Sequence, residues 1–584
     1  YKTVDIPMGE FWINSPTHDK PNDMRDAISG AHIYGKPVVQ AEAFTSVRMN
    51  WGEHPGNLKT TGDRNFALGI NKFSIHVFTH NPWLHRKPGM TLDGVGLYFQ
   101  RDQTWFQQSK AWIDYLTRCQ YLLQQGKHVA DIAVFTGEQL PRRSLLPDRL
   151  VATLPGLFGE KKVKEEEQRL RNEGQPTRVI PDGVRHSANM ADPEDWIDPL
   201  NGYDYDSFNP DVLLQATVNN GKVVFPGGAT YAILVIPATH KMLPDKGYMS
   251  VPVAKKILQL VREGATILMD NAYEKTYGLQ EQNDSLRMIM HELFSNKNLK
   301  GRVMALPYTG NAFSQWGVDR DVEIAENDHT IAWTHRRVGE EDLYFVANQA
   351  DYAQHKTISF RVAGKKPEIW DAVTGERYSI TEYLEKNGRT YITLPFDAGE
   401  SFFIVFRSDS DAALPVFAKA DVVFTKTMEG PWRVQFDTAF GGPEKPAVFN
   451  TLQRWTSHAD PGIKYYSGTA VYQKSFKWNR KHTGKVWLTI DSVFNIATVK
   501  VNGMECGTVW TKPYRADITQ AIRRGKNTIE IFVSNTWANR LIGDQQLPEA
   551  KRVTWTTAPF RLAGKPLLPA GITGKVRVVE MSGN

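Results

Sequence analysis

The order of apolar and polar positions near the start of the chain predicts a strand, a helix and a second strand. The two strand-like stretches are residues 2–8 and 37–41. Between them, Asn22–Tyr34 has the spacing of a single helix, which ends at Gly35. Parallel strands need a crossover connection, and a strand–helix–strand unit of about 30 residues is the one that builds parallel sheets.

The same alternation continues to about residue 129. It predicts a third strand at Lys72–His80, a fourth at Val95–Phe99 and an amphipathic helix at Thr104–Gln125. We therefore expect residues 1–129 to be the C-terminal part of a catalytic (β/α)8 barrel. About four strands are half of such a barrel, and half a barrel leaves open sheet edges. The expectation is that an N-terminal part of the same protein precedes this chain.

Beyond residue 129 the pattern changes three times. Apolar runs alternate with helices over 130–299, which predicts a doubly wound, flavodoxin-like α/β accessory domain. Short strands over 300–410 predict a β-sandwich, and a linker is expected at Ser408–Ala412. A second β-rich domain over 411–584 contains the hairpin signal Asn502-Gly503. The predicted fold class is multidomain, α/β followed by β.

The composition of the chain argues against several classes of function. The net charge is +6, from 70 basic and 64 acidic residues, and no basic cluster alternates with aromatic residues as in nucleic-acid binding. No apolar run is long enough to span a membrane. Cys119 and Cys506 are the only cysteines, which excludes a disulfide framework and a cysteine-based metal site. The aromatic content of 11% suits stacking on sugars, although large β-rich proteins are also rich in aromatic residues.

Candidate chemistry centres on Glu10 and Glu42, each placed at the carboxyl end of an expected strand. Parallel α/β folds hold ligands and catalytic groups at that end. The two are 42 − 10 = 32 residues apart, one βα unit, so they should lie on neighbouring strands about 4.8 Å apart. At that spacing both can act on one water or one cation. They are poorly placed to hold a glycosidic bond from opposite faces, which requires about 5 to 9 Å, so the opposing acid should lie elsewhere.

Five further side chains are candidates for contact with a sugar. Trp51 and His54 follow the second expected strand. His76 and His80 lie in the third expected strand, and Trp83 follows it. Each also has a structural interpretation. His76 lies deeper in its strand than His80 and is as readily a core histidine, and the two tryptophans are as readily packed within their loops.

With these residues identified, the chain resembles the α-L-rhamnosidases of glycoside hydrolase family 106. The resemblance rests on Met8–Trp12, Ala41–Thr45, His76–His80, Pro88–Met90 and Trp112–Gly126, together with the order of the accessory domains. The C-terminal region looks like the galactose-binding-like jelly roll of many large glycosidases. It does so through Tyr472, Val501–Gly503, Pro513-Tyr514 and Asn535–Arg540.

The resemblance implies an inverting enzyme that uses calcium and carries another catalytic glutamate upstream of this chain. The expected activity is removal of terminal α-L-rhamnose from plant-type polysaccharides or glycosides. Glu42 is expected to be the general base, because Ala41 and Ala43 leave room for a substrate beside it. Glu10 is expected to assist, with a tentative role as a calcium ligand. The carbohydrate substrate implies a periplasmic or extracellular location.

Two other functions stay open. A retaining β-galactosidase-like hydrolase would share the jelly roll and the α/β domain, but its acid and nucleophile are usually much further apart in sequence than 32 residues. A non-catalytic carbohydrate-binding protein would keep the fold without the chemistry. The anomer first released from an aryl α-L-rhamnoside separates inverting from retaining enzymes, and complete inactivity favours the binding protein.

Overall fold

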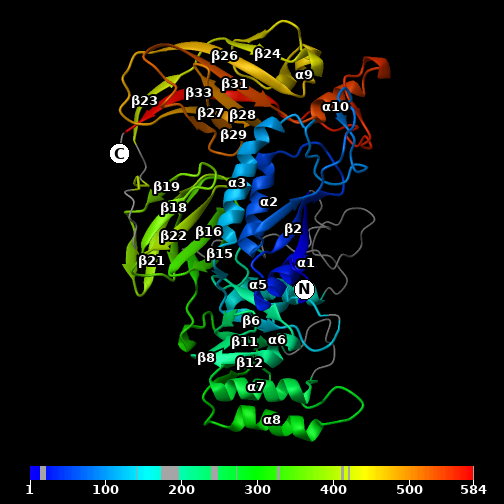
Figure 1. The fold of residues 1–584 in the computed structure, drawn as a ribbon, viewed down its shortest axis with the longest axis vertical. Coiled ribbons are helices and arrows are strands. Elements are labelled where there is room, and N and C mark those ends of the chain that lie inside the picture. Colours follow the sequence, from blue (N-terminus) through cyan, green and yellow to red (C-terminus); the bar gives the residue numbers. More distant parts are fainter. Residues whose placement is uncertain are drawn as a thin grey trace.

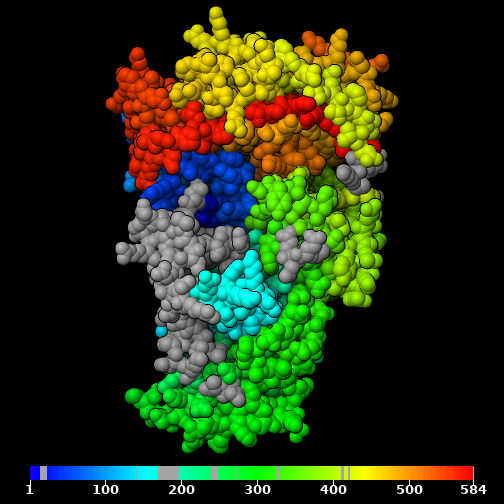
Figure 2. Space-filling model, turned by 180° about the vertical axis from the view of Figure 1, so that it is seen from behind, coloured from blue at the N-terminus to red at the C-terminus, as the bar shows by residue number. Residues whose placement is uncertain are grey.

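The computed structural model describes residues 1–13, 21–140, 142–171, 196–237, 247–270, 273–324, 329–408, 414–417 and 421–582. Four parts follow one another along the chain (Figure 1). The N-terminal segment lies between the C-terminal β-rich part and the α/β part, and the opposite side of the molecule shows the same order (Figure 2). The expected linker at Ser408–Ala412 lies, apart from Ser408, outside the described residues.

The N-terminal segment is a parallel three-stranded sheet with helical crossovers. Its strands are hydrogen-bonded in the order β1-β2-β3. Its elements are β1 (Met8–Ile13), α1 (Pro21–Ile33), β2 (Gln40–Ser46), α2 (Pro55–Leu68), β3 (Lys72–Ile75) and, further on, α3 (Lys110–Leu123). The predicted strand–helix–strand–helix–strand order is therefore present.

The strand ends differ from the prediction. Glu10 and Glu42 lie inside β1 and β2 rather than after them, because both strands begin later and continue further than the apolar stretches indicated. His80 lies in a loop, since β3 already ends at Ile75. The expected strand 95–99 is not a regular strand in the structure. Leu97 nevertheless exchanges backbone hydrogen bonds with the end of β3, accepting from Val77 and donating to the carbonyl of His76.

One aromatic cluster fixes the buried face of this sheet. Phe11 and Phe44, from β1 and β2, meet edge to face with ring centroids 5.0 Å apart, and Phe73 of β3 lies 5.4 and 5.5 Å from them. Phe66 of α2 stacks on Phe73 at 4.2 Å and also touches Phe345 at 6.1 Å. The core of the N-terminal segment is therefore continuous with that of the following β-rich part.

The α/β part contains a five-stranded parallel sheet in the order β13-β12-β11-β6-β7. Counted along the chain this is the 2-1-3-4-5 order of flavodoxin-like sheets. Its strands are β6 (Ile132–Phe135), β7 (Tyr205–Phe208), β11 (Ile233–Ile236), β12 (Thr266–Met269) and β13 (Arg302–Met304). Its helices are α4 (Pro147–Leu150), α5 (Pro155–Arg171), α6 (Pro210–Gln215), α7 (Val251–Glu263) and α8 (Asn283–Ser295). A small antiparallel sheet adds β8 (Thr217–Asn219), β9 (Lys222–Val224) and β10 (Thr230–Tyr231).

Two antiparallel sheets follow, and their facing side chains share one core that includes Tyr344 and Phe360, 4.8 Å apart. The first sheet contains β14 (Val322–Ile324), β17 (Gln354–Phe360), β21 (Arg389–Phe396) and β20 (Leu384–Lys386). The second contains β19 (Arg377–Ser379), β18 (Lys366–Trp370), β22 (Ser401–Arg407), β16 (Glu341–Asn348), β15 (Ile331–Val338) and β5 (Lys127–His128).

These pairings shift two expected boundaries. β13 belongs to the α/β sheet although it lies beyond residue 299, and β5 pairs with β15 although it lies before residue 130. Both strands are too short to show a clear apolar period, so the sequence pattern did not reveal their partners.

The C-terminal part also consists of two antiparallel sheets. One contains β23 (Val422–Thr427), β33 (Gly571–Met581), β27 (Val486–Phe494) and β30 (Arg515–Asp517). The other contains β25 (Ala447–Phe449), β24 (Trp432–Gln435), β26 (Thr469–Trp478), β31 (Gly525–Ser534), β28 (Ile496–Val501) and β29 (Met504–Val509). Asn502 and Gly503 have φ angles of 53° and 83° and form the predicted hairpin between β28 and β29.

Two short strands attach this part to the N-terminal segment. β4 (Pro88–Gly89) pairs in parallel with β32 (Trp555–Thr556), near the short helix α10 (Ala538–Asp544). Another short helix, α9 (Pro461–Lys464), lies on the outer side (Figure 1). The mixed α/β and β-rich class predicted from the sequence is confirmed. No helix among the described residues has both the length and the apolar character needed to cross a bilayer.

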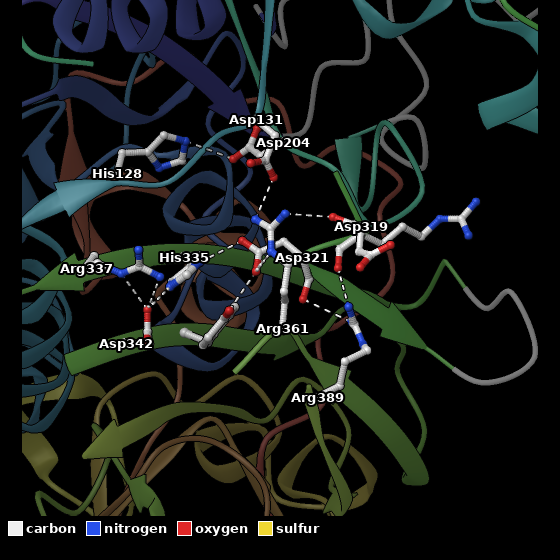
Figure 3. A network of polar contacts seen from close by, with 12 residues as sticks. His128, Asp131, Asp204, Asp319, Asp321, His335, Arg337, Asp342, Arg361 and Arg389 are labelled. Atoms are coloured by element: carbon white, nitrogen blue, oxygen red, sulfur yellow. Dashed lines mark hydrogen bonds and ion pairs between the residues drawn. The ribbon is translucent and has the colours of Figure 1, made fainter. Parts of the chain in front are cut away.

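A buried charge network joins the α/β part to the β-rich part that follows it (Figure 3). The ring of His335 lies between two carboxylates, with Nδ1 2.7 Å from Asp321 and Nε2 3.0 Å from Asp342. Arg361 donates to Asp131, at the start of β6, over 2.7 Å. The network therefore connects the two parts through buried His335 and aspartates and a partly exposed arginine, Arg361.

The two carboxylates hold the His335 ring in its charged form. Burial alone would lower the pKa of His335, but Asp321 and Asp342 raise it above its ordinary value. Burial likewise acts to raise the pKa of Asp321, but the charge and hydrogen bond of His335 lower it to about 2. Protonated His335 is thus the central cation of the network.

Replacing His335 with glutamine should destabilise this part of the protein. Removing one partner of a buried ion pair costs about 3–5 kcal/mol, and we expect a loss of that size in the free energy of unfolding. The contribution of the charged ring is complete below the ordinary histidine pKa of about 6.5 and is lost as the pH rises through its raised pKa in the folded state. Chemical denaturation across neutral and alkaline pH measures both effects.

His355→Gln is the matched control, because His355 is exposed on β17 of the same part. It should leave both the stability and its pH dependence unchanged. A pH profile of His335→Gln that runs parallel to the wild-type profile would contradict the assigned charge.

Candidate active site

Glu10 and Glu42 lie side by side on neighbouring strands, as their spacing predicted. The parallel register of β1 and β2 pairs Glu10 directly with Glu42. Gly9 and Phe11 point into the buried face, so Glu10 points to the opposite face, and both glutamates are half-buried. The two carboxylates therefore share one face of the sheet, on the side away from the aromatic cluster.

A β-bulge in β2 adds a third polar group to this face. The register runs from Glu10–Glu42 to Trp12–Thr45, so β2 contains one extra residue. Phe44 takes up that residue with a φ of 64°, held by its packing in the aromatic cluster. Bulges of this kind redirect side chains and often lie beside active sites. Here the bulge lets the Thr45 hydroxyl donate to Glu42 Oε1 over 2.6 Å.

Two further side chains lie beside the carboxylates. Trp12 Nε1 donates to Glu10 Oε2 over 3.1 Å. His76 Nδ1 lies 3.9 Å from Glu42 Oε1, and its side chain is 26% exposed. The structure thus brings together three predicted residues and adds the hydroxyl of Thr45 and the indole of Trp12, which the sequence did not single out as site residues.

Gly96 makes room for His76. Its φ is +86°, and a Cβ added there would lie 2.9 Å from His76 Nδ1 and 3.2 Å from the His76 carbonyl oxygen. Gly96 also donates its backbone N–H to Ser46, at the end of β2, over 2.7 Å. Glycine at this position therefore lets residues 95–97 pack against the histidine while remaining bonded to the strand that carries Glu42.

His54 and Trp51 are placed away from this group, in structural positions. His54 precedes α2, where its backbone N–H donates to Asn57 Oδ1 over 2.9 Å, and burial lowers its pKa to about 4. Trp51 is 5% exposed and packs against Tyr98 with ring centroids 4.8 Å apart. Trp51 also belongs to an apolar cluster with Trp537, so it lies in the contact between the N-terminal segment and the C-terminal part.

Trp83 and His80 lie in the loop after β3. Trp83 meets Trp555 edge to face at 5.3 Å and therefore contributes to the attachment of the C-terminal part. His80 is exposed, and the structure gives it no contact with Glu10 or Glu42. These two side chains are not brought together with the carboxylates.

The carboxylate and hydroxyl oxygens of the site are of the kind that calcium prefers. Glu10 and Glu42 would hold the ion, but calcium takes six to eight oxygen ligands, so further ligands would have to complete its shell. Within the described ranges, one group of three metal-ligating side chains lies elsewhere, namely His32, His128 and Asp206. There His32 Nδ1 lies 3.0 Å from Asp206 and the two rings stack at 4.1 Å, which joins α1 to β7.

Two carboxylates on adjacent parallel strands, one of them hydrogen-bonded by a hydroxyl and lying beside a histidine, can accept a proton from water. A β-rich C-terminal part accompanies them, and residues 460–565 match the galactose-binding-like domain of glycosyl hydrolase family 2. This combination of side chains and accessory domain identifies the chain as a glycoside hydrolase.

A match over more of the chain identifies its family within the glycoside hydrolases. Residues 1–163 and 186–384, more than half of the chain, match the family profile of glycoside hydrolase family 106, described as α-L-rhamnosidase. The chain belongs to this family, and the resemblance expected from the sequence is confirmed.

The chain is also similar to individual proteins. A rhamnosidase from Novosphingobium sp. PP1Y has 31% identical residues and a TM-score of 0.80, over 99% of this chain and 51% of that one. A putative β-glucuronidase from Formosa agariphila is 24% identical over 94% of this chain and 61% of its own length. A β-glucuronidase from Ruminococcus gnavus shares 28% of this chain and 30% of its own at 20% identity, with a TM-score of only 0.21. The chain thus spans about half of the matching rhamnosidase and three fifths of the curated relative.

Replacing Gly96 with alanine should destabilise the site region. The positive φ costs roughly 1–2 kcal/mol for a residue with a side chain. The contact with His76 adds an overpacking cost of about 1–3 kcal/mol. Gly430→Ala is the matched control, because Gly430 has a φ of +78° and no atom within 4 Å of an added Cβ. Equal losses in the free energy of unfolding for both variants would show that the contact with His76 contributes nothing.

Proposed function

We propose that this chain is part of an inverting α-L-rhamnosidase that removes terminal α-L-rhamnose from plant-type polysaccharides or glycosides. The observation that carries the proposal is the register pair of Glu10 and Glu42, with Thr45 and His76 in place around Glu42. Membership of family 106 supports the sugar specificity. We also propose that the protein acts outside the cytoplasm, because its proposed substrate is a polymer.

Glu42 is proposed as the general base. Its Oε1 accepts the hydroxyl of Thr45, which fixes the carboxylate and leaves Oε2 to accept a proton from water. Ala41 and Ala43 are buried on the opposite face, so they do not border the side of the sheet on which Glu42 would meet the substrate. Glu10, anchored by Trp12, would orient the same water from the neighbouring strand.

The proposed reaction proceeds in one displacement. The water oxygen bonds to the anomeric carbon, Glu42 takes the water's proton, and the glycosidic C–O bond breaks. A general acid gives a proton to the leaving oxygen. Adjacent strands lie about 4.8 Å apart, and inverting enzymes separate acid and base by about 6.5–9.5 Å across the sugar. Glu10 and Glu42 would therefore act on the same side, and we propose that the acid lies upstream of this chain.

Calcium is proposed as the cofactor, with Glu10 as a ligand. When bound, it would supply positive charge that offsets the repulsion between two neighbouring carboxylates. The residues of this chain would still perform the proton transfer, since Glu42 has its own hydrogen-bond partner in Thr45.

The test of the function is the hydrolysis of an aryl α-L-rhamnoside by the protein that contains this chain together with its upstream part. Proton NMR during the first minutes should show β-L-rhamnose before mutarotation. First appearance of the α-anomer would overturn the inverting mechanism. An aryl β-glucuronide is the comparison substrate because of the name of the Formosa relative, and preferential hydrolysis of it would overturn the assigned sugar.

Glu42→Gln should lower kcat by at least about a hundredfold, since a positioned base contributes about 10² to 10⁴ in rate. The amide keeps the shape of the side chain, so the melting temperature should stay near that of the wild type. Glu382→Gln, at an exposed position in a loop, is the control and should leave kcat unchanged. A Glu42→Gln variant with wild-type kcat and unchanged melting would remove Glu42 from the mechanism.

Removal of calcium should abolish activity, and added calcium should restore it. Glu10→Gln should weaken calcium binding measured directly by titration calorimetry, because it removes one of the two carboxylates that face each other. Glu382→Gln again serves as the control. Full activity in protein shown to be metal-free by elemental analysis would contradict the cofactor assignment.

A further inference from the structure

A large pocket lies between the N-terminal segment and the C-terminal part. Its volume is about 890 Å³. One wall is formed by the loop that follows β2, with Arg48, and by the start of α2, with Asn57, and the other is formed by α10 and residues 561–568. The proposed mechanism uses none of these residues.

Three cations, Arg48, Arg561 and Lys565, line this pocket together with one buried carboxylate, Glu53. All three are exposed, and among the described residues none of them forms an ion pair with a carboxylate. The hydrogen bond given by the Arg561 side chain is a long one, 3.5 Å to the carbonyl of Val47. Three exposed positive charges against one buried carboxylate leave the concavity with an excess of positive charge, which attracts an anion.

The rest of the lining limits the kind of anion. None of the lining residues is aromatic, so a nucleic-acid base would find no ring to stack on. Met49, Leu562 and Leu568 supply apolar surface beside the charges. Apolar surface next to guanidinium groups suits a sugar ring that carries a carboxylate or a sulfate, because arginine binds such oxyanions with paired hydrogen bonds.

The loop wall is already ordered. Gly52 donates its backbone N–H to Asn50 Oδ1 over 2.9 Å and accepts a hydrogen bond from Asn57 Nδ2 over 3.0 Å. A preformed loop reduces the entropy lost on binding. The position is also close to Glu42: Arg48 is 48 − 42 = 6 residues further along the chain, so their Cα atoms are at most about 20 Å apart.

We propose that this pocket binds an anionic sugar unit, bearing a carboxylate or a sulfate ester, within the part of the substrate that remains after the terminal sugar is released. Its role as a substrate subsite rests on the proposed function, whereas binding of the anionic sugar does not. The pocket would hold an acidic oligosaccharide by its charge while the chain end reaches Glu42.

Titration calorimetry on the protein that contains this chain together with its upstream part tests the binding without catalysis, because none of the probes carries a rhamnoside. The probes are trigalacturonate, its fully methyl-esterified form and a sulfated neutral tetrasaccharide. We expect at least one anionic probe to bind about tenfold more tightly than the neutral ester, with affinity that falls as salt is added. A preference for trigalacturonate assigns a carboxylate-bearing sugar, and a preference for the sulfated probe assigns a sulfate ester.

The double variant Arg561→Gln/Lys565→Gln should weaken that binding about tenfold or more. Arg524→Gln/Lys526→Gln is the matched control, because these two cations are exposed elsewhere in the C-terminal part, outside the pocket. Equal affinity for anionic and neutral probes, or equal losses in the two double variants, would overturn the site.

Activity assays separate this inference from the proposed function. If anionic sugars bind but no rhamnose is released by the longer protein, the proposed function fails and the binding site stands. If neutral aryl rhamnosides are hydrolysed but no anionic probe binds, the proposed function stands and the pocket assignment fails.

Discussion

The packing of Phe44 is the constraint on which the site depends. This side chain is fully buried among rings from β1 and β3, yet its backbone has a φ of 64° and supplies the extra residue of the bulge. Positive φ is costly for a bulky residue, and it persists only where the surroundings determine it. The apolar face of the sheet therefore fixes the positions of the polar groups on the other face. Without the bulge, Thr45 would point to the face opposite Glu42, since side chains alternate along a strand.

Buried charges act alongside apolar packing where the parts meet. His335 lies between Asp321 and Asp342 at one boundary, and Asp206 holds His32 at another. A buried ion pair adds little net stability compared with an apolar replacement, but it is costly to break. Such pairs therefore act mainly by disfavouring other arrangements of the parts, in which the pairs would be broken. The relative placement matters here because the sheet that carries both glutamates lies between the other parts.

The central pair of the site followed from the sequence because a βα repeat fixes which strands are neighbours. The 32-residue interval sufficed to place Glu10 beside Glu42, and the residues that match family 106 were visible as short runs. The bulge was not visible, since it depends on rings contributed by three strands. Trp51 and His54 were expected near a sugar because loops of barrels hold ligands, but Trp51 packs on Tyr98 and His54 begins α2. Whether such a side chain contacts a sugar or packs internally depends on its burial between parts of the chain. No local sequence pattern reveals that burial.

The pairing of β4 with β32 has a consequence for synthesis of the protein on the ribosome. Pro88 is matched with Trp555, a partner 555 − 88 = 467 residues later in the chain. The loops around the carboxylates are therefore translated well before the segments that pack against Trp51 and Trp83. During that interval these tryptophans lack their partners from the C-terminal part. The contacts of these two tryptophans with the C-terminal part can form only after residues 537–555 have left the exit tunnel.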